Sequence, residues 1–140
     1  MMKRPVYRMR ANESLVSGLA YLANLLPLWG ILIAWAARES WRERSRHVVF
    51  HTTQAIWLQV ALLLAFIAYA VIRLVGNLVG EIHATAGAIL NRLNDWVLLL
   101  LVVLYVVACL ALSWLTLDGR TILLPLLGPR IHRQEYEEGE

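Results

Sequence analysis

Three long runs without a charged side chain alternate with short charged segments along this chain, at residues 15–37, 48–72 and 96–117. A helix over residues 48–72 would be about 37 Å long, which exceeds a bilayer's hydrocarbon core of about 30 Å. The run at 96–117 is rich in Val and Leu and has Trp96 and Trp114 near its ends, where aromatic residues typically meet the membrane interface. Both runs therefore predict membrane-spanning helices.

The first run, at 15–37, is interrupted in its middle by Pro27 and Gly30. Proline removes a backbone N–H and clashes with the preceding turn, so a helix kinks or breaks there. Two arrangements remain open: one kinked span, or two short helices that meet at a re-entrant turn within the membrane. With this run counted as the first of three long hydrophobic segments, the pattern predicts an all-α polytopic membrane helix bundle.

The other segments divide the chain into one membrane domain and two tails. Residues 1–14 form a basic tail and residues 132–140 an acidic tail, with a single membrane domain at 15–131 between them. Residues 76–95 mix glycines, small residues and charges, which predicts an interfacial helix or loop. The apolar run 121–127 is too short to cross a membrane and contains a proline, so we expect it to lie in the interface.

The composition agrees with a membrane protein. Hydrophobic residues make up 59% of the chain and charged residues 16%, compared with about 45–50% and about 25% in soluble domains. The net charge of +3 requires no nucleic-acid partner, because the basic residues flank apolar runs, where anionic lipid headgroups attract them. The single cysteine, Cys109, excludes an intrachain disulfide, and we expect it to be a small buried hydrophobic residue.

The distribution of Lys and Arg favours the re-entrant arrangement. If the chain turns back at Pro27, the two ends and the 38–47 loop share one side with 11 basic residues, against 2 for the 73–95 loop. A single kinked span would instead divide them 6 against 7, which gives no orientation. Because cytoplasmic loops carry the Lys/Arg excess, we expect both termini in the cytoplasm and the protein in the inner (plasma) membrane.

Polar residues within the apolar runs are the candidates for function. The central run begins with Arg46 and His47 and then carries His51, Gln54 and Gln59. Positions i, i+4 and i+7 from the first histidine share one helix face. Two histidines at this spacing can hold a metal, and polar groups at membrane depth can also line a hydrophilic path. We favour interhelical hydrogen bonds instead, and we predict no metal and no cofactor.

The first run also has a mildly polar face, because four residues recur at three- and four-residue spacing: Ser14, Ser17, Tyr21 and Asn24. Either Asn12 or Ser14 is suited to cap the helix that begins there. Asn24, Pro27 and Gly30 are the helix-packing candidates of this run. Nucleotide-binding loops and nucleophile motifs are missing from the sequence, so no enzyme is predicted, and the expected partners are the lipid bilayer and other membrane subunits.

The order of these features resembles a known family: a broken apolar segment, a short charged loop, and Arg-His-x-x-Phe-His-x-x-Gln-Ala leading into a long span. The family comprises small bacterial membrane proteins of unknown function related to the twenty-kilodalton Tic component of the chloroplast inner-envelope import machinery. The matching residues are Arg46, Phe50, His51, Gln54, Ala55 and Gln59. The basic loop at 38–46 and the acidic tail depart from the family's pattern.

This resemblance implies a helical membrane protein of three or four segments, with no reaction assigned to it. The plastid relative implies protein import as part of a complex. We therefore expect a non-enzymatic accessory or structural subunit, or an assembly factor, of a membrane complex. A protein-translocation or channel-like component is the alternative.

Overall fold

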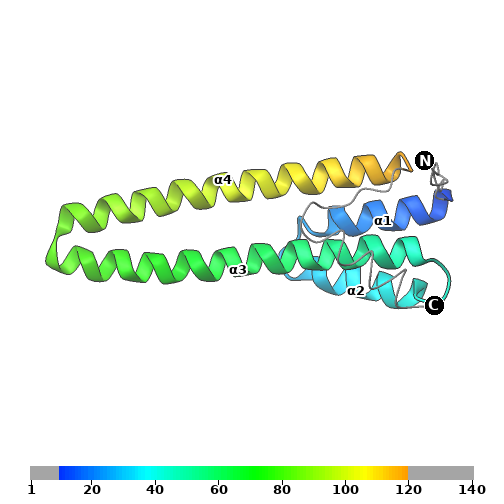
Figure 1. The fold of residues 1–140 in the computed structure, drawn as a ribbon, viewed down its shortest axis with the longest axis horizontal. Helices are drawn as coiled ribbons and strands as arrows, with labels where there is room; N and C mark the ends of the chain where they lie inside the picture. Colours follow the sequence, from blue (N-terminus) through cyan, green and yellow to red (C-terminus); the bar gives the residue numbers. More distant parts are fainter. Residues whose placement is uncertain (1–9, 120–140) are drawn as a thin grey trace, which may run out of the picture. The chain divides into compact units, whose positions relative to one another are not determined.

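The computed structural model describes residues 10–119, which form four helices joined by short connections (Figure 1). These are α1 (Ala11–Ala23), α2 (Trp29–Trp41), α3 (Arg46–Ile82) and α4 (Ala84–Leu117). Within residues 10–119 no strand occurs, so the all-α prediction is confirmed for this part of the chain. The segments predicted as an interfacial run, 121–127, and an acidic tail, 132–140, lie outside the described residues, as does most of the basic tail.

The prediction of three long hydrophobic segments is wrong for the first of them. Residues 15–37 are divided between α1 and α2, which have 13 residues each and are thus only about 20 Å long. Between them the chain turns over residues 24–28, and Leu28 takes a left-handed backbone conformation with φ 67°. Of the described helices, only α3 and α4 are long and apolar enough to cross a membrane.

The two short helices form a hairpin rather than one kinked span. They contact each other (Figure 1). From α1 into the turn, the contacts on α3 move toward its C-terminal end: Tyr21 contacts Gln54, and Leu26 contacts Gln59. Along α2 they move back toward its N-terminal end: Gly30 contacts Gln59, and Arg38 contacts Thr53. The chain therefore reverses direction at Pro27, where sequence analysis placed the break.

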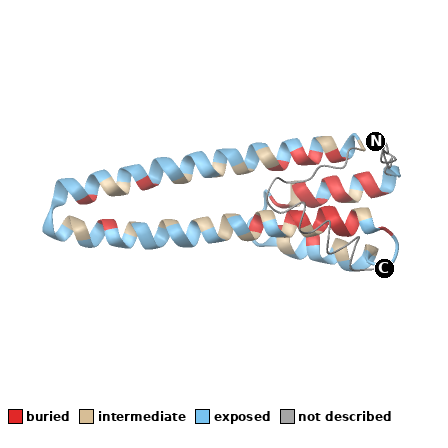
Figure 2. Ribbon diagram, viewed as in Figure 1, coloured by how far each residue is buried: buried red, intermediate tan, exposed pale blue. Residues whose placement is uncertain are grey.

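By their contacts, the described residues fall into two compact units, which we call the first and the second unit. The first unit contains residues 10–59 and 109–119, and the second contains residues 60–108. In the first unit α1 and α2 pack with the start of α3 and the end of α4 around a small core: Ala20, Tyr21, Ala34, Ala55 and Leu112. Figure 2 shows that most of the buried residues belong to these helices.

The second unit is a hairpin of two helices that are interrupted only at His83. Of the two alternatives predicted for residues 76–95, an interfacial helix or a loop, the structure shows helix, because α3 continues to Ile82 and α4 begins at Ala84. Polar pairs and a close backbone approach hold the two helices together in this region: Arg73 with Asp95, Asn77 with Asn91, and Gly80 with Gly87. These contacts explain how a segment rich in glycine and charge remains helical.

Candidate functional site: a buried polar core in the first unit

The interior of the first unit is unusually polar for a protein this hydrophobic. Seven of its polar side chains are at most 1% exposed: Ser17, Asn24, His51, Thr52, Gln54, Gln59 and Thr116. They come from α1, α3 and α4 and from the turn after α1. Because a buried polar group is expensive to leave without a hydrogen bond, the arrangement of their partners decides what this core can do.

The Tyr21 hydroxyl lies at the centre of the core. It donates a hydrogen bond to Gln54 Oε1 at 3.0 Å and lies 3.2 Å from His51 Nδ1. A tyrosine hydroxyl has only one hydrogen to donate. Since Gln54 takes it, the hydroxyl oxygen accepts from His51 Nδ1–H, and His51 Nε2 is left as an acceptor. The ring of Phe50 packs edge-on against the imidazole of His51, with ring centroids 5.2 Å apart.

Two other side chains form hydrogen bonds between α3 and the turn that joins α1 to α2. Asn24 Nδ2 donates to the carbonyl of Ala55 at 2.7 Å, and Gln59 Nε2 donates to the carbonyl of Leu26 at 3.1 Å. Irregular backbone at membrane depth is tolerated only where protein groups cover it. Gly30 makes this approach possible, because a Cβ at this position would collide with Gln59 and with the backbone of Asn24.

Hydroxyl groups join α1 to α4 at the other end of the hairpin. Ser14 Oγ donates to the carbonyls of Thr116 and Leu117 at 2.6 and 2.8 Å, and Ser113 Oγ donates to the carbonyl of Gly18 at 2.9 Å. Ser14 is therefore a bridge between helices and not the cap that its position suggested. The cap interaction is made by Glu13, whose carboxylate accepts from the backbone N–H of Arg10 at 3.0 Å.

Five side-chain atoms of this core, including the hydroxyls of Ser17 and Thr116, are buried and have no hydrogen-bond partner among the described residues, and three of them stand out: His51 Nε2, Gln54 Nε2 and Gln59 Oε1. All three lie on α3 and belong to residues that are 0% exposed. An imidazole nitrogen, an amide N–H and an amide oxygen together offer both acceptors and donors. This core can hold water or another small neutral polar molecule, and it can hold helices together, but it carries no net charge of its own.

The other residues singled out from the sequence lie around this core. Arg46 is exposed at the start of α3, His47 is half-buried in its first turn, and Ala55 is buried against α1. Pro27 is exposed in the turn between α1 and α2. Between residues 10 and 119 no three His, Cys, Asp or Glu side chains are grouped closely enough to hold a metal ion. Within that range His47 and His51 thus lack a third ligand.

Sequence analysis missed Tyr21 as the central residue of the core, and it missed Ser113 and Thr116 altogether. The three- and four-residue spacing of polar residues in α1 was the available signal for Tyr21. For the two α4 residues no signal existed, because hydroxyl groups in a Leu-rich helix commonly bond within their own helix. Only the packing of α4 on α1 brings the Ser113 hydroxyl to the carbonyl of Gly18 and the carbonyl of Thr116 to Ser14.

Comparison of the chain with protein-family models, with curated proteins and with solved structures found no match. The resemblance to the Tic-related family of small bacterial membrane proteins therefore still depends on the residues of the central run alone. Any functional conclusion has to come from the geometry described above.

Proposed function

We propose that this chain is a non-enzymatic integral membrane protein that serves as an accessory or structural subunit, or an assembly factor, of a membrane complex. The observation that carries the proposal is the outer surface of the second unit. Large apolar side chains of α3 there are more than half exposed, among them Leu64 at 60%, Ile67 at 61% and Leu74 at 61%. Since the second unit contains only two helices, much of this surface is available to helices of another protein.

Helix association within a bilayer depends on close packing and hydrogen bonds, because lipid tails are as apolar as leucine. The first unit supplies a rigid anchor of this kind, with polar side chains that bond α1 to α3 and α4. We propose that this anchor fixes the chain in the inner membrane with both termini in the cytoplasm, and that the second unit presents its apolar faces to the partner.

Photo-crosslinking combined with co-purification tests this proposal. A photoreactive residue placed at Leu64 or Ile67 should yield defined protein adducts in intact membranes, and the same proteins should co-purify with the chain in mild detergent. A photoreactive residue at Glu43, which is exposed in the charged segment between α2 and α3, is the matched control and should yield none of these adducts. Crosslinks to lipid alone at Leu64 and Ile67 would refute a partner at this surface.

A translocation or channel-like component is the second candidate. The buried atoms of His51, Gln54 and Gln59 that have no partner in the described part of the chain favour it, because polar residues at membrane depth often mark the path of a solute or ion. We expect such an activity to appear as solute flux across vesicles that contain the purified protein. Replacing His51 and Gln54 together by leucine should abolish the flux without preventing insertion, and vesicles without flux would exclude the candidate.

A further inference from the structure

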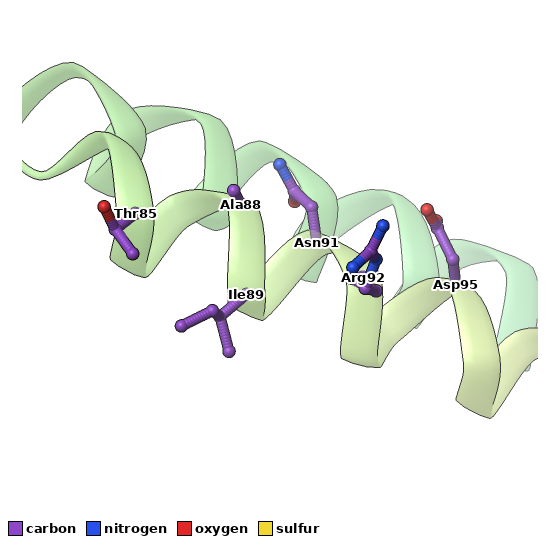
Figure 3. Close-up of a pocket in the computed structure, with 6 residues that line it drawn as sticks. All are labelled: Thr85, Ala88, Ile89, Asn91, Arg92 and Asp95. Carbon is purple, nitrogen blue, oxygen red and sulfur yellow. The ribbon is translucent and has the colours of Figure 1, made fainter.

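The second unit has a shallow hollow on the surface of α4, and none of its lining residues belongs to the buried polar core. Its volume is about 420 Å³, and its lining comes entirely from α4: Thr85, Ala88, Ile89, Asn91, Arg92 and Asp95. Figure 3 shows that Asn91, Arg92 and Asp95 extend on one side of the helix while Ile89 extends on the other. Polar and charged groups thus gather on one side of α4 within residues 91–95, about one and a half helical turns.

The charges of this hollow leave one cation without a counterion. The Asp95 carboxylate accepts hydrogen bonds from Arg73 and from the Tyr69 hydroxyl, so its charge is balanced within the hairpin. Arg92 is exposed, and it forms no hydrogen bond or ion pair with any residue between 10 and 119. The hollow therefore has a net positive charge and five guanidinium N–H donors available for an anion.

The position of Arg92 along α4 matches the depth of lipid phosphates. It precedes Trp96, the first residue of the uncharged run, by four residues, which is about 6 Å along a helix axis. Headgroup layers extend about 5–7 Å beyond the hydrocarbon core on each side. With Trp96 at the interface, as its exposure of 65% and its aromatic character allow, the guanidinium of Arg92 is level with the phosphates.

An exposed apolar stripe continues from Arg92 along the same face of α4. Positions i+4, i+7, i+8 and i+11 from this arginine share its helix face, and their side chains are all at least half exposed: Trp96, Leu99, Leu100 and Val103. A cation at the end of an apolar stripe matches a phospholipid, in which a charged phosphate is followed by apolar acyl chains. A free anion has no apolar part that could contact the stripe.

We propose that Arg92 and the hollow around it bind the phosphate of an anionic phospholipid whose acyl chain lies along the stripe from Trp96 to Val103. The unbalanced charge of Arg92 selects an anionic headgroup over a zwitterionic one, because the carboxylate that would attract an amine is already paired with Arg73. This inference depends on α4 crossing the membrane, as the proposed function has it, but it requires no protein partner.

Native mass spectrometry of the full chain from detergent micelles, with added phosphatidylglycerol or phosphatidylcholine, tests the proposal. We expect the wild type to retain phosphatidylglycerol in preference, and Arg92→Gln to lower its apparent affinity about fivefold, the effect of about 1 kcal/mol for one basic residue near an anionic surface. Arg92→Lys should fall between the two, since lysine keeps the charge but not the planar fork of donors. Inorganic phosphate should not displace the lipid.

Arg44→Gln is the matched control, because it removes the same charge at an exposed position outside the hollow and should leave the affinity nearly unchanged. An affinity of Arg92→Gln equal to that of the wild type would overturn the proposal, as would equal losses in both variants or displacement by inorganic phosphate. Resistance to alkaline extraction shows separately that each variant is still inserted. If Arg92→Gln loses the lipid but is still inserted and still co-purifies with the same proteins, the result supports the lipid site independently of the proposed function.

Discussion

A single hydroxyl group organises the polar core of the first unit. Tyr21 is completely buried, and its oxygen lies within hydrogen-bond distance of both His51 and Gln54 on the facing helix. The remaining polar atoms of these two side chains, His51 Nε2 and Gln54 Nε2, have no hydrogen-bond partner among the described residues. Tyr21 is therefore the residue through which α1 reaches both polar side chains of α3.

The first prediction is that Tyr21 and Gln54 are energetically coupled. Tyr21→Phe keeps the ring and removes only the hydroxyl, so the change tests the hydrogen bond without creating a large cavity. In a double-mutant cycle with Gln54→Leu, we expect a coupling free energy of about 0.6 kcal/mol and not above about 1.7 kcal/mol, the range for such bonds in membrane proteins. The measurement is the unfolding free energy in mixed micelles.

A cycle between Tyr21→Phe and Trp57→Phe provides the control, because Trp57 is 48% exposed and lies outside the buried core. The coupling free energy of this pair should be close to zero. Equal couplings in the two cycles would mean that the Tyr21 hydroxyl does not join the helices as described.

Part of this core can be found from the sequence and part cannot. His51, Gln54 and Gln59 are conspicuous because they interrupt an apolar run, and Asn24 stands out in the same way. What they bond to depends on how α1 and the turn after it pack on α3, so the carbonyls of Leu26 and Ala55 appear as partners only in the structure. Backbone acceptors have no sequence signature, and this limits any prediction of a buried polar network.

At the scale of the elements, both hairpins depend on glycines that allow backbones to approach. Gly30 lets α2 start against Gln59 in the first unit, and Gly87 lies against Gly80 in the second. Sequence analysis identified the break at Pro27 because proline has a local effect on the helix. It did not identify the close approach of the second unit, because residues 76–95 contain the glycines and charges that are typical of a loop and only their pairing across the hairpin keeps them helical.

The two glycines of the second hairpin should differ in their tolerance of alanine. A Cβ on Gly87 would lie 2.5 Å from Gly80 Cα, whereas a Cβ on Gly80 would have Gly87 Cα as its nearest neighbour at 3.9 Å. We expect Gly80→Ala to be neutral or to stabilise by up to about 1 kcal/mol through helix propensity. Gly87→Ala should destabilise the hairpin, because overpacking costs about 1–3 kcal/mol.

Unfolding free energies of the two variants in the same detergent provide the measurement, and each variant serves as the other's control. The contact described here predicts that Gly87→Ala is the less stable of the two. Equal stabilities, or the reverse order, would show that the two backbones do not approach each other at this point.

At the scale of the whole molecule, the number of membrane crossings decides on which side each connecting segment lies. Two of the four described helices are long and apolar enough to cross, and the other two form a hairpin that is too short to do so. We predict that the two ends of the chain and residues 38–47 share one side of the membrane, because they contain 11 Lys and Arg residues against 2 in residues 73–95. The charge distribution agrees with this arrangement and would be unexplained if the first run crossed once.

The most direct test of this claim is a set of topology reporters that are active on only one side of the membrane, fused at each terminus and inserted at His83 between α3 and α4. We predict that both terminal fusions report from the cytoplasm and that the insertion at His83 reports from the opposite side. Terminal fusions that report from opposite sides would contradict the re-entrant hairpin and restore a single crossing by residues 15–37.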